Sequence, residues 1–242
     1  MPSLYRQLAL GQNPLLRLAR KLYWGLFSFS IPVSRALVVA PVRIFVAARM
    51  VFYSLMRALI AEPYFRSYCT RVGKNFHTGP LLHWVEGDGR ILLGDHISIT
   101  GRSNFFFALR YSEEPTLEIG DFCGFGHNCS FVVGKRIEFG KHCRIASNVT
   151  FFDTPGHPLD PEIRRTGAPA RDEEVKPIVI RDNVWIGTNS TIFPGVEIGE
   201  NSVVAYGSVV MTSVPANVVV AGNPARQITK LTTAEASGKS SQ

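Results

Sequence analysis

The sequence predicts an all-β solenoid, a prism of short strands, preceded by an α-helical extension. The first observation is a strict period of six over residues 180–215, where each unit opens with an aliphatic residue and has a small or β-branched residue four places later. A helix repeats its apolar face every three to four residues and a lone strand every two, so a period of six fits one side and one corner of a prism. The second observation is that Asn or Gly recurs at the fourth place, where a tight turn needs a positive φ. The third is a change from a basic to a near-neutral composition after residue 72. The opening residues are Ile180, Ile186, Ile192, Ile198, Val204 and Val210, and the fourth-place residues are Asn183, Asn189, Gly195, Asn201 and Gly207.

The N-terminal extension, residues 1–72, is strongly basic. It holds ten Lys and Arg residues and one acidic residue, Glu62, so it carries a charge of +9, and the rest of the chain carries −2 of the total of +7. A near-neutral solenoid argues against a nucleic-acid partner. The charge of the extension favours an anionic membrane surface, which we expect residues 1–62 to contact from the cytoplasmic side.

Residues 42–61 predict a helix that ends at Pro63. At 100° per residue, Arg43, Arg49 and Arg57 fall within an arc of about 120°, and the rest of the circumference is aliphatic or aromatic. Such a helix can lie in a membrane interface, pack on the solenoid or a partner chain, or cross the membrane. Recurrent arginines disfavour a span, so the interface is the preferred placement. The aromatic residues expected below the headgroups are Trp24, Phe27, Phe29, Phe45 and Phe52.

The solenoid is expected over residues 73–231, although residues 64–90 show turn residues and no recognisable period. The period of six departs at Phe105, resumes at Ile119 and slips by two residues before Phe139. Three of the four cysteines fall at small inward places, so we expect core residues in a reducing compartment rather than disulfides. They are Cys123, Cys129 and Cys143.

The period breaks after Phe151, and residues 153–177 form a long polar loop between two regular stretches. A long loop on a rigid scaffold is either functional or tolerated disorder. His157 lies at its start, in Thr154-Pro-Gly-His-Pro158, and imidazole suits proton transfer at neutral pH. A turn histidine without a function is an equally open interpretation. Residues 232–242 are predicted to be a disordered tail.

Three other histidines raise the question of zinc. His96, His127 and His142 are separated by 31 and 15 residues, which is not a compact ligand spacing. We therefore predict no metal site and expect histidines at prism corners. Trp185 ends its unit and is expected to face outward, where it can pack against a coenzyme or a neighbouring subunit.

The hexads of residues 180–215, the triplet Gly156-His-Pro158 and the segment Gly222-Asn-Pro-Ala-Arg226 together resemble the left-handed β-helix hexapeptide-repeat acyltransferases. The resemblance covers about residues 91–231 and is nearest to the maltose, galactoside and nodulation O-acetyltransferases and to the acetyltransferases of exopolysaccharide (colanic acid-type) gene clusters. It implies a left-handed parallel β-helix, a homotrimer with active sites between adjacent prisms, acetyl-CoA as co-substrate and a sugar or glycan acceptor.

The resemblance also implies roles for individual residues. His157 matches the general base of the family, and Asn128 matches a polar residue near the acceptor. Met211-Thr212 stands where many relatives have a Thr-Lys pair, so one cation on the phosphate side is missing. The coenzyme groove is expected to contain Trp185, Thr188, Tyr206, Gly207, Met211, Thr212, Arg226 and Lys230.

Three functions follow for comparison. The favoured one is acetyl transfer from acetyl-CoA to a hydroxyl of an exopolysaccharide, capsule or O-antigen precursor, by a peripheral protein at the inner face of the cytoplasmic membrane. The first alternative is a zinc-dependent hydratase of the γ-carbonic-anhydrase type. The second is a non-catalytic, membrane-associated scaffold, which would have no reason to bind coenzyme A.

Overall fold

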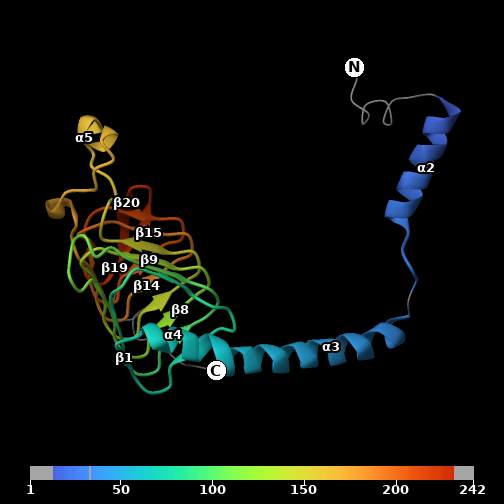
Figure 1. The fold of residues 1–242 in the computed structure, drawn as a ribbon, viewed down its shortest axis with the longest axis horizontal. Coiled ribbons are helices and arrows are strands. Elements are labelled where there is room, and N and C mark those ends of the chain that lie inside the picture. The colour runs from blue at the N-terminus through green and yellow to red at the C-terminus, as the bar shows by residue number, and fades with distance from the viewer. Residues whose placement is uncertain (1–12, 33, 232–242) are drawn as a thin grey trace. The chain divides into compact units, whose positions relative to one another are not determined.

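The computed structural model describes residues 13–32 and 34–231, so the predicted tail, residues 232–242, lies outside the described residues. The chain divides into two compact units, Met1–Met50 and Val51–Gln242. The first unit is helical, and the second contains the solenoid (Figure 1).

The first described helix, α2 (Pro14–Ser28), begins at an N-cap asparagine followed by proline. The side-chain oxygen of Asn13 accepts the Leu15 N–H at 3.0 Å, and Pro14 needs no N–H partner at the first helical position. No residue of α2 is buried. Its exposed apolar side chains are Leu15, Leu18, Leu22, Tyr23, Trp24, Leu26 and Phe27.

The second helix, α3 (Arg35–Met56), runs directly into a π-helical turn, η1 (Arg57–Ala61), and then into α4 (Glu62–Tyr68). The prediction that Pro63 ends the helix was therefore wrong. Proline cannot donate a backbone hydrogen bond, and the wider π turn before it absorbs the change, with the Glu62 N–H donating to the Arg57 carbonyl five residues back. Within the described residues, the stretch Leu37–Tyr68 is long and apolar enough to cross a membrane by length and composition.

Arg57, which the sequence pattern groups with Arg43 and Arg49 on one face of the helix, makes specific contacts with protein groups. Its guanidinium pairs with Glu62 at 2.9 Å and lies 3.2 Å from the Nδ1 atom of His77, on the first coil of the solenoid. The helix beyond it covers the end of the prism. Phe65 of α4 is fully buried, with its ring 5.9 Å from that of Phe76 and 4.9 Å from that of Phe105.

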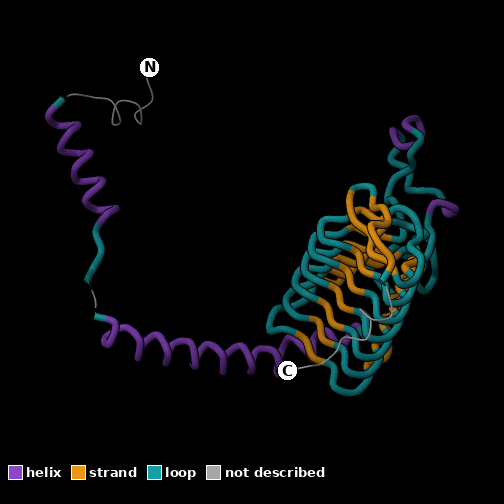
Figure 2. The backbone as a smooth tube through the Cα atoms, turned by 180° about the vertical axis from the view of Figure 1, so that it is seen from behind, coloured by secondary structure: helices purple, strands orange, loops and turns teal. Residues whose placement is uncertain are grey.

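The solenoid is a left-handed parallel β-helix, as the family resemblance implies, and it is built of three sheets. Each coil visits sheet A, then B, then C, and every strand pair is parallel except β19–β20. Figure 2 shows the stacked coils from behind. Sheet A holds β1 (Arg71–Val72), β4 (Arg90–Leu93), β7 (Thr116–Ile119), β10 (Arg136–Phe139), β13 (Ile178–Ile180) and β16 (Glu197–Ile198). Sheet B holds β2 (His77–Thr78), β5 (Ser98–Ile99), β8 (Gly124–Phe125), β11 (Arg144–Ile145), β14 (Trp185–Ile186), β17 (Val203–Val204), β19 (Val218–Gly222) and β20 (Ala225–Lys230). Sheet C holds β3 (Trp84–Glu86), β6 (Asn104–Phe107), β9 (Ser130–Val133), β12 (Thr150–Phe152), β15 (Thr191–Ile192) and β18 (Val209–Val210).

The inward places of the hexads form the core, which confirms that part of the prediction. All six aliphatic openers of residues 180–215 are buried, and so are the six residues four places later. In sheet C the inward residues of the earlier coils are phenylalanines. The rings of Phe105, Phe131 and Phe151 stack on successive coils, with centroids 5.0 and 5.5 Å apart. The three cysteines of the repeats are buried and free, and burial raises the pKa of Cys129 to about 11.

The fourth place of the hexad turns the corner with a positive φ, also as predicted. Asn183 and Asn201 lie on the edge between sheets A and B with φ near 60°, and their side-chain amides form a ladder at 2.9 Å that continues to Asn217 at 3.0 Å. Earlier coils use aromatic residues at the same edge. The ring of Phe122 stacks between His96 at 4.7 Å and His142 at 5.0 Å.

The first coil was not recognisable from the period of six. Strands β1 to β3 already form a complete coil, and Phe105, taken as the start of an excursion, is an inward residue of β6. The pattern is hidden because two inward places are polar. Thr78 and His83 are both buried, and His83 Nε2 lies 2.6 Å from Thr78 Oγ1.

Candidate active site

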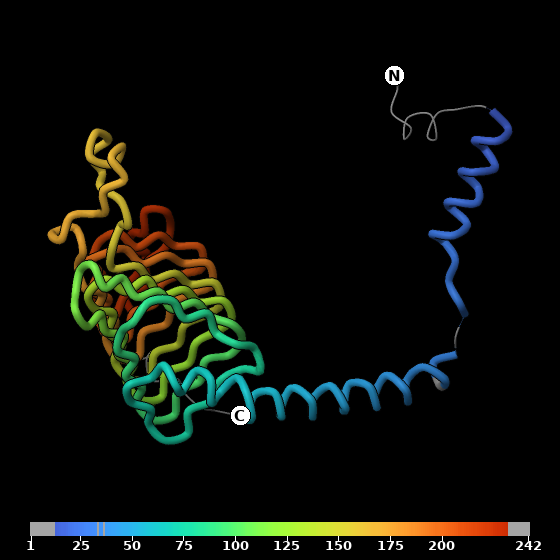
Figure 3. Tube along the Cα trace, in the orientation of Figure 1, coloured from blue at the N-terminus to red at the C-terminus, as the bar shows by residue number. Residues whose placement is uncertain are grey.

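His157 is carried by the loop of residues 153–177, which leaves the prism between β12 of sheet C and β13 of sheet A. Figure 3 shows this loop projecting from the stacked coils. It contains a short helix, α5 (Pro161–Arg165), and a 3₁₀ turn, η2 (Asp172–Glu174). The His157 side chain is exposed, and Gly156 before it has a φ of 78°, a backbone angle that glycine adopts without strain.

Asp153 anchors both ends of this loop. Its carboxylate is fully buried and accepts backbone N–H groups from Gly134, Lys135 and Arg136. Its carbonyl accepts the Lys176 N–H at 2.9 Å, so the loop closes on the residue at which it starts. Burial raises the pKa of the Asp153 carboxyl, and the backbone donors oppose that rise. All three contacts need an acceptor, so they favour the carboxylate.

The loop leaves the prism at the edge between sheets C and A, which we call the C–A edge. Met211 and Thr212, which follow β18, lie at the same edge, and both are exposed. The loop is also attached to the prism by an ion pair between Lys135 Nζ and Asp172 at 2.9 Å. This edge therefore carries the candidate general base and two of the expected coenzyme residues.

The other expected residues lie elsewhere on the prism. The edge between sheets B and C, the B–C edge, carries Asn128, Thr188, Tyr206 and Gly207, because these follow β8, β14 and β17. Asn128 donates a side-chain hydrogen bond to Asn148 on the next coil at 3.1 Å, and Tyr206 is 82% exposed. The expected acceptor residue and the candidate base thus lie on opposite edges of sheet C.

Trp185, Arg226 and Lys230 belong to sheet B. Trp185 is 56% exposed on the outer face of β14, as expected for an outward residue. Arg226 and Lys230 lie at opposite ends of β20, where they pair with Ala221 and Val218. One chain therefore does not bring all eight expected coenzyme residues to one place.

The three histidines considered for zinc do not converge within one chain. His96 and His142 lie on the A–B edge with the Phe122 ring between them, whereas His127 lies on the B–C edge. Over residues 13–32 and 34–231, there is no group of three or more His, Cys, Asp or Glu side chains that could hold a metal ion.

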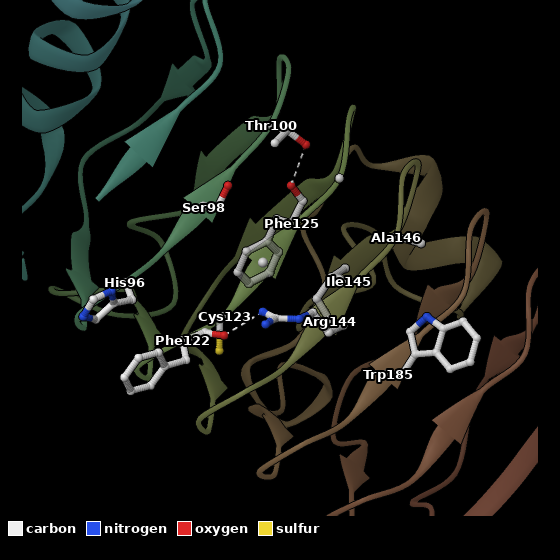
Figure 4. Close-up of a pocket in the computed structure, with 12 residues that line it drawn as sticks. His96, Ser98, Thr100, Phe122, Cys123, Phe125, Arg144, Ile145, Ala146 and Trp185 are labelled. Carbon is white, nitrogen blue, oxygen red and sulfur yellow. Dashed lines mark hydrogen bonds between the residues drawn. The ribbon is translucent and has the colours of Figure 1, made fainter. Parts of the chain in front are cut away.

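A hollow of about 580 Å³ lies on the outer face of sheet B, and sequence reasoning did not find it. Figure 4 shows Arg144 reaching toward Phe122 on one side and Trp185 standing on the other. The column of outward residues on β5, β8, β11 and β14 forms its floor. A periodic alignment could have found this column, because its members occupy the sixth place of successive hexads. They are Ser98, Gly124, Arg144 and Trp185.

The comparisons with known proteins agree with this architecture. The family model of bacterial transferase hexapeptide (six repeats) matches residues 177–212. The galactoside O-acetyltransferase of Escherichia coli (strain K12) is 42% identical over 104 residues, which are 43% of this chain and 49% of that protein. The galactoside O-acetyltransferase of Lactococcus lactis is 40% identical over 97 residues, which are 40% of this chain and 44% of that protein. The matched stretch spans about half the length of these curated relatives.

Solved structures cover more of the chain. The hexapeptide-repeat acetyltransferase VCA0836 of Vibrio cholerae, in complex with acetyl coenzyme A, is similar over 74% of this chain and 82% of that chain, with 27% identity and a TM-score of 0.50. The N-acyltransferase AntD of Bacillus cereus matches over 71% of this chain and 89% of that chain with a TM-score of 0.56. Its 21% identity supports the fold alone.

Proposed function

Because residues 177–212 match the hexapeptide-repeat transferase model and the chain is similar to named acetyltransferases, we propose that the protein transfers an acetyl group from acetyl-CoA to a hydroxyl of a sugar or glycan precursor. The observation that carries the proposal is the exposed His157 on a loop that interrupts the repeat and is closed at its base by Asp153. Similarity to two galactoside O-acetyltransferases supports a sugar hydroxyl as acceptor.

The proposed reaction needs one base and no covalent enzyme intermediate. The imidazole of His157 takes the proton from the acceptor hydroxyl as its oxygen attacks the thioester carbonyl. The carbon–sulfur bond then breaks, the acetyl group stays on the acceptor oxygen, and the proton passes from the imidazolium to the departing thiolate. The cysteines of the repeats are not candidate nucleophiles, because Cys123, Cys129 and Cys143 are at most 1% exposed.

The proposed coenzyme groove follows the last coils, with Trp185, Thr188, Tyr206 and Gly207 beside the pantetheine arm. Exposure of Trp185 and Tyr206 supports this part, because two aromatic faces on adjacent coils are available to a ligand. Met211, Thr212, Arg226 and Lys230 are proposed to lie toward the nucleotide end.

A homotrimer is part of the proposal, because the site residues lie on different edges. Asn128 lies on the B–C edge and His157 on the loop beyond the C–A edge, so sheet C separates them within one chain. Adjacent prisms in a trimer can bring the C–A edge of one copy to the B–C edge of the next. In that arrangement each active site takes its base from one chain and its acceptor residue from another.

We also propose that the extension holds the enzyme peripherally at the inner face of the cytoplasmic membrane, where precursors of exopolysaccharide, capsule or O-antigen are assembled. The exposed apolar residues of α2 and α3 and the charge of +9 on residues 1–72 support a lipid partner.

The test of the reaction combines calorimetric titration of acetyl-CoA with an acetyl-transfer assay on wild-type protein, His157→Ala and His142→Ala. We expect His157→Ala to lower kcat by about 10²–10⁴-fold, the range for loss of a general base, with the Kd for acetyl-CoA unchanged. His142→Ala, which removes an exposed histidine at another edge, is expected to keep wild-type kcat. Full activity in His157→Ala would refute the assignment of the base.

A further inference from the structure

The hollow on the outer face of sheet B is shaped by a glycine. Gly124 pairs with Ser98 on one side and Arg144 on the other, so the three residues form one outward row across adjacent strands. A Cβ atom at position 124 would lie 3.3 Å from Arg144 Nη1, a contact that crowds the guanidinium. Because residue 124 has no side chain, the Arg144 side chain can lie across β8 at the floor of the hollow.

The Arg144 guanidinium keeps most of its hydrogen-bonding capacity. Its Nη1 donates to the Phe122 carbonyl at 2.7 Å, and in the part of the chain that the structure describes no carboxylate lies within ion-pair distance of it. A guanidinium has five N–H donors, and its planar fork matches two oxygens of a carboxylate or phosphate. The described residues that line the hollow include no acidic side chain.

The opposite side of the hollow offers an aromatic face. Trp185 is 56% exposed, and it stands next to Arg144 across the β11–β14 pair. Ser98 adds a hydroxyl to the floor. Binding sites for small molecules combine an apolar or aromatic wall with a few polar groups that orient the ligand. A ring that stacks on Trp185 and carries an oxyanion toward Arg144 satisfies both sides of this hollow.

We propose that this hollow binds the acetyl acceptor, and that Arg144 selects a sugar that carries an oxyanion, either a carboxylate or a phosphate. This inference rests on the proposed function, because only an acetyltransferase has an acetyl acceptor to bind. Trp185 lines the hollow and also begins the proposed coenzyme groove on the later coils. Gly126 and Ala146, which also line the hollow, begin the B–C edge, where the proposed trimer brings the His157 loop of a neighbouring copy. Arg144 is then a specificity-determining residue for that reaction.

The experiment measures binding of three probes to the full chain in about 150 mM salt, which screens exposed charges. The probes are methyl β-D-glucoside, its uronic acid, which replaces the neutral hydroxymethyl group with a carboxylate, and glucose 1-phosphate. The variants are Arg144→Gln, Gly124→Val, which fills the floor with a strand-favouring side chain, and Arg110→Gln, a matched control that removes an exposed arginine outside the hollow. Each sample is also titrated with acetyl-CoA.

We expect at least one anionic probe to bind at least about tenfold more tightly than the neutral glucoside, because a charge-assisted bidentate contact is stronger than a neutral one. Arg144→Gln is expected to abolish that preference, Gly124→Val to abolish binding of all three probes, and Arg110→Gln to change neither. Preference for the uronic acid identifies a carboxylate acceptor, and preference for glucose 1-phosphate identifies a phosphorylated one.

Equal binding of the three probes to wild-type protein, binding of neither anionic probe, or an undiminished preference in Arg144→Gln overturns the inference. The acetyl-CoA titration separates this failure from failure of the proposed function. Acetyl-CoA binding without an Arg144-dependent preference removes only the inference. Arg144-dependent binding of an anionic sugar without acetyl-CoA binding removes the proposed reaction and leaves an anionic-sugar site.

Discussion

At the scale of single residues, His83 shows how a polar side chain can replace an apolar one inside the prism. Its Nδ1 accepts the Ser103 N–H at 3.1 Å, so Nε2 carries the ring proton and donates to Thr78 Oγ1. Thr78 in turn donates to the Ile99 carbonyl at 3.3 Å. The Phe65 ring lies 4.5 Å from the imidazole and covers it from the end of the solenoid. The neutral form fills every hydrogen-bonding role, and a second proton would displace the Ser103 donor.

This arrangement makes stability depend on pH. Burial lowers the pKa of His83 from 6.5 to about 4. Between those values His83 binds a proton in the unfolded chain but not in the folded chain. The contribution of His83 to the free energy of unfolding is therefore complete above pH 6.5 and is lost as the pH falls toward 4. We expect a loss of about 3 kcal/mol over this range, at 1.36 kcal/mol per unit. Urea unfolding between pH 7 and pH 4.5 measures it.

The His83→Gln variant tests the cause. It is expected to be less stable than wild type at pH 7 but to show a shallower decline below pH 6.5, whereas His142→Gln, an exposed histidine, keeps the wild-type slope. An unchanged slope in His83→Gln would assign the pH dependence to other groups.

Residues could be predicted well where the repeat dictates their direction. The sixth place of each hexad faces outward on sheet B, so the row containing Gly124, Arg144 and Trp185 was available from the sequence once the hexads were aligned by coil. Its chemistry was not available, because the hollow depends on where the Arg144 side chain lies. At the corners, too, the sequence predicts the backbone but not the side-chain contacts. A period of six predicts a positive φ at residue 122, but it does not predict that the Phe122 ring stacks between two imidazoles.

At the scale of elements, the buried carboxylate of Asp153 holds the loop of residues 153–177 at the point where the loop leaves the prism. We expect Asp153→Asn to lower the free energy of unfolding by about 1–3 kcal/mol, because an amide turns a donor toward backbone N–H groups that need an acceptor. Asp153→Asn is also expected to lower kcat for the proposed acetyl transfer, because the loop that carries His157 is then held less firmly where it leaves the prism. The Kd for acetyl-CoA should stay within about twofold, since the proposed groove lies chiefly on the later coils. Chemical unfolding and steady-state kinetics measure the two effects.

Asp172→Asn is the matched control for this loop. It breaks the exposed ion pair with Lys135, in which Asp172 is 71% exposed, and exposed pairs contribute about 0–1 kcal/mol. If Asp172→Asn reduced stability and kcat as much as Asp153→Asn does, the loop would be held by its surface contacts rather than by its buried base.

The elements that the sequence missed share a physical cause. The period of six reports only apolar inward places, so a coil whose inward places include Thr78 and His83 shows no period. The helix beyond Pro63 was missed for a different reason. Proline predicts an end because it cannot donate, and only the π turn of residues 57–61 shows how the backbone accommodates it. The fold class was nevertheless predicted correctly, because the hexads of residues 180–215 repeat without interruption.

At the scale of the whole molecule, the predicted division of charge and the exposed helices lead to one further expectation. The solenoid residues after position 72 carry a net charge of −2, so we expect attraction to an anionic bilayer to come chiefly from the basic extension. That extension also exposes large aromatic side chains, among them Trp24 at 62% and Phe45 at 65%. Electrostatic attraction brings such a segment to the surface, and burial of the aromatic rings in the interface retains it.

We expect the full chain to float with vesicles that contain about one-third phosphatidylglycerol and to bind phosphatidylcholine vesicles less tightly, with the difference shrinking as salt increases. The double variant Trp24→Ser/Phe45→Ser should lower the partition constant at least about tenfold, because each buried aromatic contributes about 1.5–3 kcal/mol. Leu109→Ser, which removes a 51% exposed leucine from the solenoid, is the matched control and should bind as wild type does. Alkaline carbonate should release the protein from native membranes. Retention after carbonate treatment would instead identify a spanning segment within Leu37–Tyr68, N-terminal to the Phe65 that packs on the solenoid, since a spanning segment is not extracted by high pH. Equal binding of the double variant and wild type would show that the extension does not insert its aromatic residues into lipid.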